Sequence, residues 1–147
     1  MLISRDISIF SFAFCTSKRR DYITKLVAKN VMRMPNAGGL AFNFTWGKTL
    51  RGGIGHMFGV ECVCGFREEK GFCASCCVDS YVKEAESLGW DFDEGYLFSD
   101  AKKGQRVPGP IKTASLTRLL KKYLKDFDIF DTKTMQSFRS GGLFAEF

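Results

Sequence analysis

Cysteines are the residues of this 147-residue chain whose spacing most directly suggests chemistry. Five of its six Cys fall within one short stretch, in the pattern C-x-C-x8-C-x2-C-C. Two close pairs of thiolates can hold a tetrahedral zinc ion. The first pair is C-x-C rather than C-x-x-C, however, and buried reduced Cys is the commoner outcome. The sequence therefore predicts no bound metal and no cofactor. A zinc site is the alternative, with Cys62, Cys64, Cys73 and Cys76 as its ligands.

Cations gather at three further places in the sequence. Lys18, Arg19 and Arg20 follow each other directly, and Lys48 lies in the Gly-rich loop 47–55, G-K-T-L-R-G-G-I-G. A charge run is ordinarily a solvated face, and this loop lacks the G-x-x-x-x-G-K-[ST] order of a phosphate cradle. The third place is the polar loop Ser99 to Pro110, which could rest on a DNA backbone or be solvated. Its cations are Lys102, Lys103 and Arg106.

The composition fits one globular domain with a single core. Hydrophobic residues make up 45% of the chain, and 22 Lys and Arg against 16 Asp and Glu give a net charge of +6. This charge suits a polyanionic partner but also many other proteins. The apolar stretch Ile7 to Phe14 is too short to span a bilayer and is expected to be a buried helix. Without an export signal, the cysteines are expected to be reduced thiols.

Periodicity predicts four helices and a hairpin. The first helix spans Ser4 to Ser17, capped by Ser4, with Ile3, Ile7, Phe10 and Phe14 on one face. A second helix is expected over Arg20 to Val31, and two strands over 40–46 and 57–63. A third helix, Ala74 to Leu88, would stop at Gly89 and bury Val78, Tyr81, Val82, Ala85 and Leu88, with Tyr96, Leu97 and Phe98 packing in the core after it. The fourth, Thr113 to Lys125, sets Leu116, Leu119, Leu120 and Leu124 against Arg118, Lys121, Lys122 and Lys125.

Three phrases resemble the catalytic domain of tyrosine recombinases, the phage-integrase superfamily, and especially its members from eukaryotic mobile elements. T-M-Q-S-F-R-S-G-G at 134–142 is similar to their H-x-x-R box, and F-N-F-T-W-G-K-T-L-R at 42–51 to the hairpin that carries their catalytic Lys. L-G-W-D-F-D-E-G-Y-L-F at 88–98 resembles a third family phrase. The resemblance covers nearly all of residues 1–147. It implies an α+β, mostly helical catalytic fold with a small antiparallel β-sheet.

The resemblance also implies roles for individual residues. Arg19 and Arg139 would clamp the scissile phosphate, and Lys48 would protonate the departing oxygen. Arg20 competes with Arg19 for the first of these places, and Gln136 stands where the family has His. The family needs no metal, and its partner is duplex DNA. Contacts to DNA are expected from Arg20, Arg51, Lys102 and Lys103.

The chain departs from the family pattern at its end. The family's late His or Trp and its nucleophilic Tyr follow the Arg139 box, whereas the tyrosines of this chain all precede it. The family's N-terminal DNA-clamping domain has no counterpart in these residues. We therefore expect a C-terminally truncated recombinase domain that is inactive alone and monomeric, although family members act as tetramers. It is expected in the nucleus if the protein is eukaryotic and in the cytoplasm otherwise. The alternatives are a non-catalytic DNA-binding module and a small zinc-binding interaction protein.

Overall fold

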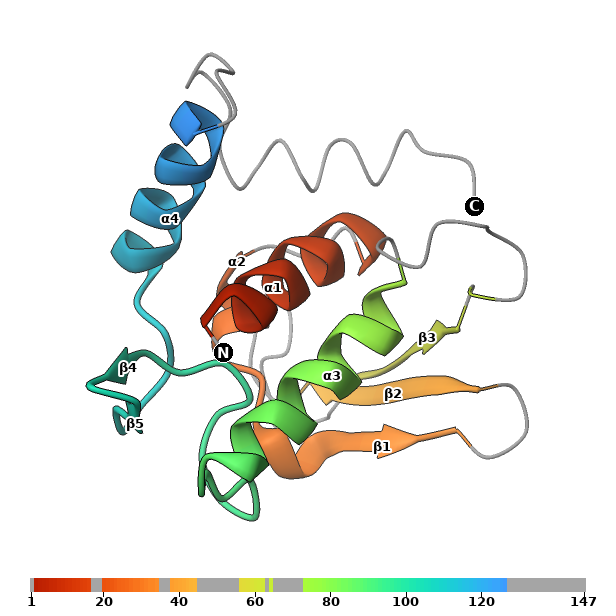
Figure 1. Ribbon diagram of the computed structural model, residues 1–147. Helices are drawn as coiled ribbons and strands as arrows, with labels where there is room; N and C mark the ends of the chain where they lie inside the picture. Colours follow the sequence, from red (N-terminus) through yellow and green to blue (C-terminus); the bar gives the residue numbers. More distant parts are fainter. Residues whose placement is uncertain are drawn as a thin grey trace.

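The computed structural model describes residues 2–16, 20–34, 38–44, 56–62, 64 and 73–126 and confirms the predicted α+β class (Figure 1). Its helices are α1 (Leu2–Thr16), α2 (Arg20–Thr24), the short 3-10 helix η1 (Ala28–Asn30), α3 (Ala74–Ser87) and α4 (Thr113–Asp126). Strands β1 (Val31–Arg33), β2 (Gly39–Phe44) and β3 (His56–Glu61) form an antiparallel sheet in the order β1-β2-β3. A separate hairpin pairs β4 (Ala101–Lys102) with β5 (Gln105–Arg106).

Strands β2 and β3 confirm the predicted hairpin. Their register pairs Leu40 with Val60 and Phe42 with Phe58, so that these side chains share one face of the sheet. Leu40, Phe42 and Val60 are buried and Phe58 is half-buried, as expected for a strand with one face on the core. Gly39 opens β2 with a φ of +138°, and a Cβ there would lie 2.4 Å from the carbonyl oxygen of Val60. Only glycine fits that position.

Helix α3 packs against strands β2 and β3, and α1 packs along α3 (Figure 1). The predicted inward residues Val78, Tyr81 and Ala85 are buried, and Val82 is half-buried. Leu88 was predicted to point inward, but it lies beyond the last helical residue and is exposed. Gly89 follows it with a φ of +89°, the left-handed conformation that ends helices, which confirms the predicted stop.

The predicted face of the first helix is wrong. Ile3, Ile7 and Phe14 are exposed, whereas Ile9 and Phe12 are buried. Ser4 is not the cap either, because α1 already begins at Leu2. The opposite face can be buried because its polar side chains form hydrogen bonds within the protein. These side chains are Arg5, Asp6, Ser8 and Thr16. Apolar spacing alone could not identify a buried face that carries charges.

A search of the described helices for a membrane span finds none of sufficient length and apolar character.

The predicted helix over Arg20 to Val31 is also wrong in extent. It ends at Thr24, and the chain continues through η1 into β1, a strand that the sequence did not predict. The amide of Ala28 donates to the Gly95 carbonyl over 3.0 Å, and the amide of Leu97 donates to the Leu26 carbonyl over 2.9 Å. These long-range bonds replace the helical ones, so tertiary contacts override the local apolar spacing.

The predictions for the segment 96–98 and for the last helix are confirmed. Leu97 and Phe98 are buried and Tyr96 is half-buried. Helix α4 buries Leu116 and Leu120, while Leu119 and Leu124 are half-buried against the same core. The cations predicted for its other face are all exposed: Arg118, Lys121, Lys122 and Lys125.

Tyr81 links α3 to the segment after it and gives the fold a testable pH dependence. Its hydroxyl donates to the Leu97 carbonyl over 3.0 Å, and burial raises the pKa of Tyr81 to about 12. A raised pKa stabilises the protonated fold below the ordinary value of 10, and this contribution is lost as the pH rises towards 12. Tyr81→Phe should cost about 1 kcal/mol at neutral pH.

The wild-type protein should then lose about 2–3 kcal/mol through Tyr81 between pH 10 and 12, a loss that Tyr81→Phe avoids. Urea unfolding of both proteins at several pH values measures the difference. The penalty of the substitution should shrink or reverse in alkali. A penalty that stays constant with pH would contradict this prediction.

Candidate functional site

Most residues predicted to act on DNA lie outside the described part of the chain. These residues are Arg19, Lys48, Arg51, Gln136 and Arg139. Arg20, the competing first arginine, is described; it opens α2 and is exposed. The roles that the resemblance gives to the other five stay predictions.

Exposed cations occur on α4 and on the β4–β5 hairpin. Along α4 they lie opposite the buried side chains of Leu116 and Leu120, because residues three or four apart share one helix face. Lys102 and Lys103 are both exposed at the hairpin turn, where Lys103 has a φ of +53°. The segment 107–112 connects this hairpin directly to α4. The structure therefore leaves these cations free of the core, as a surface that meets phosphates requires.

Arg106 belongs to neither alternative that the sequence left open for it. Its guanidinium lies 4.9 Å from the centre of the Phe92 ring. It donates hydrogen bonds to the carbonyl oxygens of Asp91, Glu94 and Tyr96. Arg106 thus holds the turn at 91–96 together through carbonyl groups that helices and strands leave unpaired. Arg106 is half-buried, and its contacts give it a structural role in this turn.

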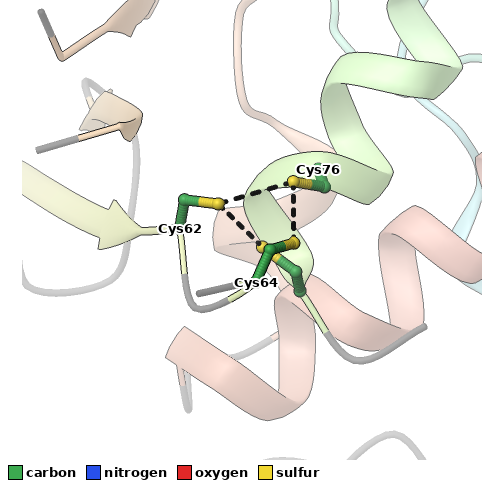
Figure 2. Close-up of side chains that lie close together, drawn as sticks. Cys62, Cys64 and Cys76 are labelled. Atoms are coloured by element: carbon green, nitrogen blue, oxygen red, sulfur yellow. Dashed lines mark hydrogen bonds between the residues drawn. The ribbon is translucent and has the colours of Figure 1, made fainter. Parts of the chain in front are cut away.

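Four of the cysteines meet in space, although they come from two different elements (Figure 2). Every Sγ atom of Cys62, Cys64, Cys73 and Cys76 lies within 4.8 Å of the other three. Sγ of Cys76 lies 3.6 Å from that of Cys62 and 3.3 Å from that of Cys64. Sγ of Cys73 lies 3.8 Å from that of Cys62. These are the four residues that the sequence named as the alternative zinc ligands.

Local structure explains how the four thiols come together. Cys62 directly follows the last residue of β3, and its amide donates to the Gly38 carbonyl over 2.9 Å, so sheet pairing continues up to it. Cys73 is the N-cap residue of α3 and Cys76 lies in the first turn of that helix. The spacing C-x2-C at a helix start places both thiols near the same end. Because β3 packs against α3, the two pairs face one another.

The other two cysteines do not join this cluster. Cys77 lies next to Cys76, but its Sγ accepts a bond from the Ser11 hydroxyl on α1 over 4.0 Å. Burial raises the pKa of the Cys77 thiol above its ordinary value. Burial and the neighbouring Cys64 thiol also raise the pKa of Cys76. Cys15, on α1, is also not part of a disulfide.

A cavity of about 560 Å³ opens between β1, α3 and the turn after α3. Arg33, Asp79, Glu86, Trp90 and Asp93 contribute to its walls. Asp79 is engaged in ion pairs with Arg33 and with Lys83, the latter at 3.0 Å. The sequence did not predict this cavity, because its walls come from segments that are distant along the chain.

Comparison with known proteins places the fold. A scan against protein-family models finds no match, and a search of curated proteins finds none either. The described architecture, helices packed on a small antiparallel sheet, has the fold of one part of a solved site-specific recombinase. One of the solved structures that it resembles is the site-specific recombinase XerH bound to its difH substrate in a pre-cleavage complex, with a TM-score of 0.64 at 15% identity. The match covers 95% of this chain and 34% of XerH, so the chain spans about a third of that recombinase's length.

Proposed function

We propose that this chain is a DNA-binding domain of the tyrosine-recombinase type, descended from a mobile-element enzyme and acting in the nucleus. The observation that carries the proposal is the fold it shares with XerH, a recombinase solved on its DNA substrate. The positive net charge of +6 supports the same partner. So does the matching order of the three sequence phrases.

The DNA-binding surface that we propose combines the exposed cations of the hairpin turn and of α4. Lys102 and Lys103 were predicted from the sequence to contact DNA, and so was Arg20, which lies on α2. The basic face of α4, also predicted from the sequence, extends the proposed surface. Because each lysine that neutralises a phosphate releases a counterion, such a surface binds duplex DNA with a steep dependence on salt. It fixes the position of the protein on DNA without reading the bases.

We further propose that these 147 residues bind DNA as a monomer without cutting it. Arg19, Lys48 and Arg139, with Gln136 in the place of His, could hold and protonate a phosphate, but a tyrosine nucleophile is also needed. Tyr81 is buried, and Tyr123 donates to Asp6 over 2.7 Å. Burial raises the pKa of Tyr81 and of Tyr123 to about 12. Neither phenol would attack a phosphate readily near neutral pH.

The DNA-binding proposal is tested by fluorescence anisotropy with a short labelled duplex over a range of salt concentrations. Lys121→Gln/Lys122→Gln and Lys102→Gln/Lys103→Gln each remove two exposed cations. Each pair should weaken binding roughly tenfold at low salt and reduce the slope of log K against log salt by about 2.

The matched control is Lys29→Gln/Lys83→Gln, which removes the same charge from η1 and α3. It should change binding much less than the other two pairs. If all three double variants bind equally weakly, only net charge matters and the proposed surface is wrong. If the wild-type protein shows no salt-sensitive binding at all, the proposal itself fails.

The absence of cleavage is tested with a nicked duplex that traps a phosphotyrosyl link. Denaturing gels should show no protein joined to DNA after long incubation, even where binding is saturated. A covalent adduct that disappears when one tyrosine is changed to Phe would contradict the proposal and identify the nucleophile.

A further inference from the structure

We infer that Cys62, Cys64, Cys73 and Cys76 form a structural zinc site that fastens the end of β3 to the first turn of α3. The inference is independent of the proposed DNA binding, since it depends only on the four thiols. A four-thiolate set fills all positions of a tetrahedral ion and leaves none for water or substrate. The site would therefore stabilise the fold rather than catalyse a reaction.

The sulfur positions carry the argument. A zinc ion with bonds of about 2.3 Å to four thiolates sets the sulfur atoms at tetrahedron edges of about 3.8 Å. Three pairs in the cluster lie at 3.3, 3.6 and 3.8 Å. All six pairs fall within 4.8 Å. The distances between the sulfur atoms are close to those around a tetrahedral zinc ion. Small movements of the side chains would make them equal to those distances.

Disulfide bonds explain the arrangement less well. A disulfide joins two sulfur atoms at about 2.0 Å and leaves each with one covalent partner. Here Sγ of Cys76 approaches both Cys62 and Cys64, and Sγ of Cys62 approaches both Cys76 and Cys73. Two sulfurs that each approach two others, in a group of four within 4.8 Å of one another, fit the ligands of one ion better than two separate bonds (Figure 2).

The position of Cys73 is a second, independent observation. It occupies the N-cap of α3, where Ser, Thr, Asp or Asn usually bonds to a free amide of the first turn. Its side chain makes no such bond. Cys73 is buried with its Sγ turned to the other thiols. A cysteine at the N-cap that makes no capping bond but lies beside three other sulfur atoms is the arrangement expected of a metal ligand. The amide end of α3 also favours the negative charge of bound thiolates.

The chemistry of the donors selects the metal. Four thiolates are soft ligands that suit zinc and exclude magnesium and calcium, which need oxygen. The cluster lies beyond the core-facing part of the sheet, because Leu40 and Phe42 are buried on β2 whereas Cys62 follows the last residue of β3. A metal here would connect the hairpin to α3 as a cross-link does.

Metal content is the decisive measurement. The full chain is expressed with zinc, purified without chelator or metal-affinity resin, and examined by inductively coupled plasma mass spectrometry. We expect about one zinc per chain. Cys64→Ser and Cys76→Ser should lose most of it. Cys77→Ser, which removes a neighbouring thiol directed at Ser11, should retain it.

A second measurement covers the case in which a ligand variant fails to fold. Cobalt added to the wild-type protein after zinc removal should give the visible absorption bands of tetrahedral thiolate coordination, and zinc should abolish them. The melting temperature of the wild-type protein should fall with chelator, by the same amount in Cys77→Ser. Zinc well below one per chain with four titratable thiols, two disulfides by mass, or iron in place of zinc would each overturn the inference.

Discussion

Replacing Asp6 by Asn is expected to lower the free energy of unfolding by about 3–5 kcal/mol. Asp6 lies on the inner face of α1 and is only 2% exposed. Its Oδ1 accepts bonds from the Arg5 guanidinium over 2.7 and 3.0 Å, and its Oδ2 accepts the Tyr123 hydroxyl over 2.7 Å. The carboxylate therefore connects α1 to α4 as well as neutralising its neighbour.

The cost arises from the charge that remains. Arg5 is 3% exposed and cannot lose its proton, so Asp6→Asn leaves a buried guanidinium without its counter-charge. Only neutral acceptors then face it, the new amide oxygen and the Ser99 carbonyl 3.1 Å away. Arg5→Met/Asp6→Asn removes that charge together with its partner. The double variant should be more stable than Asp6→Asn, although it contains one more substitution.

Asp79→Asn is the matched control, because Asp79, like Asp6, pairs with an arginine; it pairs with a lysine as well. Both partners are exposed, at 67% and 66% of their side-chain surface. Water screens these pairs, so the same substitution should cost about 0–1 kcal/mol. Urea unfolding at pH 7 compares the two variants. Equal losses for Asp6→Asn and Asp79→Asn would show that burial of the pair adds nothing.

The sequence predicted elements well where local patterns and core contacts agree. Alternation gave β2 and β3, and the spacing of Leu116 and Leu120 with the opposed lysines gave α4. Predictions from the sequence failed where contacts between residues distant along the chain determine the local structure. Residues 25–33 leave the helical path because they bond to Gly95 and Leu97, and α1 buries Arg5 and Asp6 rather than its apolar stripe. Adjacent residues on a helix do not normally face one another, so no sequence rule anticipates that pair.

The candidate sites show the same division. Spacing alone found two cysteine pairs but could not say that a strand end and a helix start would bring them together; that depends on how β3 packs against α3. Arg106 looked like another loop cation beside Lys102 and Lys103. In the structure its guanidinium donates to three carbonyl oxygens of one turn, contacts that the sequence does not reveal.

Replacing Phe12 by Ala is expected to cost about 3–5 kcal/mol, an effect comparable to that of Asp6→Asn. Phe12 is fully buried, and its ring centre lies 4.6 Å from that of Phe42 on β2 and 6.5 Å from that of Phe98. One side chain thus joins α1, the sheet and the segment after α3. Truncation would leave a cavity between three rigid elements, which cannot all move inward to fill it.

Phe14→Ala makes the same chemical change two residues further along α1, at a position that is 37% exposed. Both substitutions alter helix propensity equally, so the difference between them isolates the core contribution. Thermal and urea unfolding should show a loss for Phe12→Ala several times that for Phe14→Ala. Similar losses would mean that α1 does not present the face of Ile9 and Phe12 to the core. The apolar stripe of Ile3, Ile7 and Phe14 would then be its buried side after all, as the sequence pattern alone predicts.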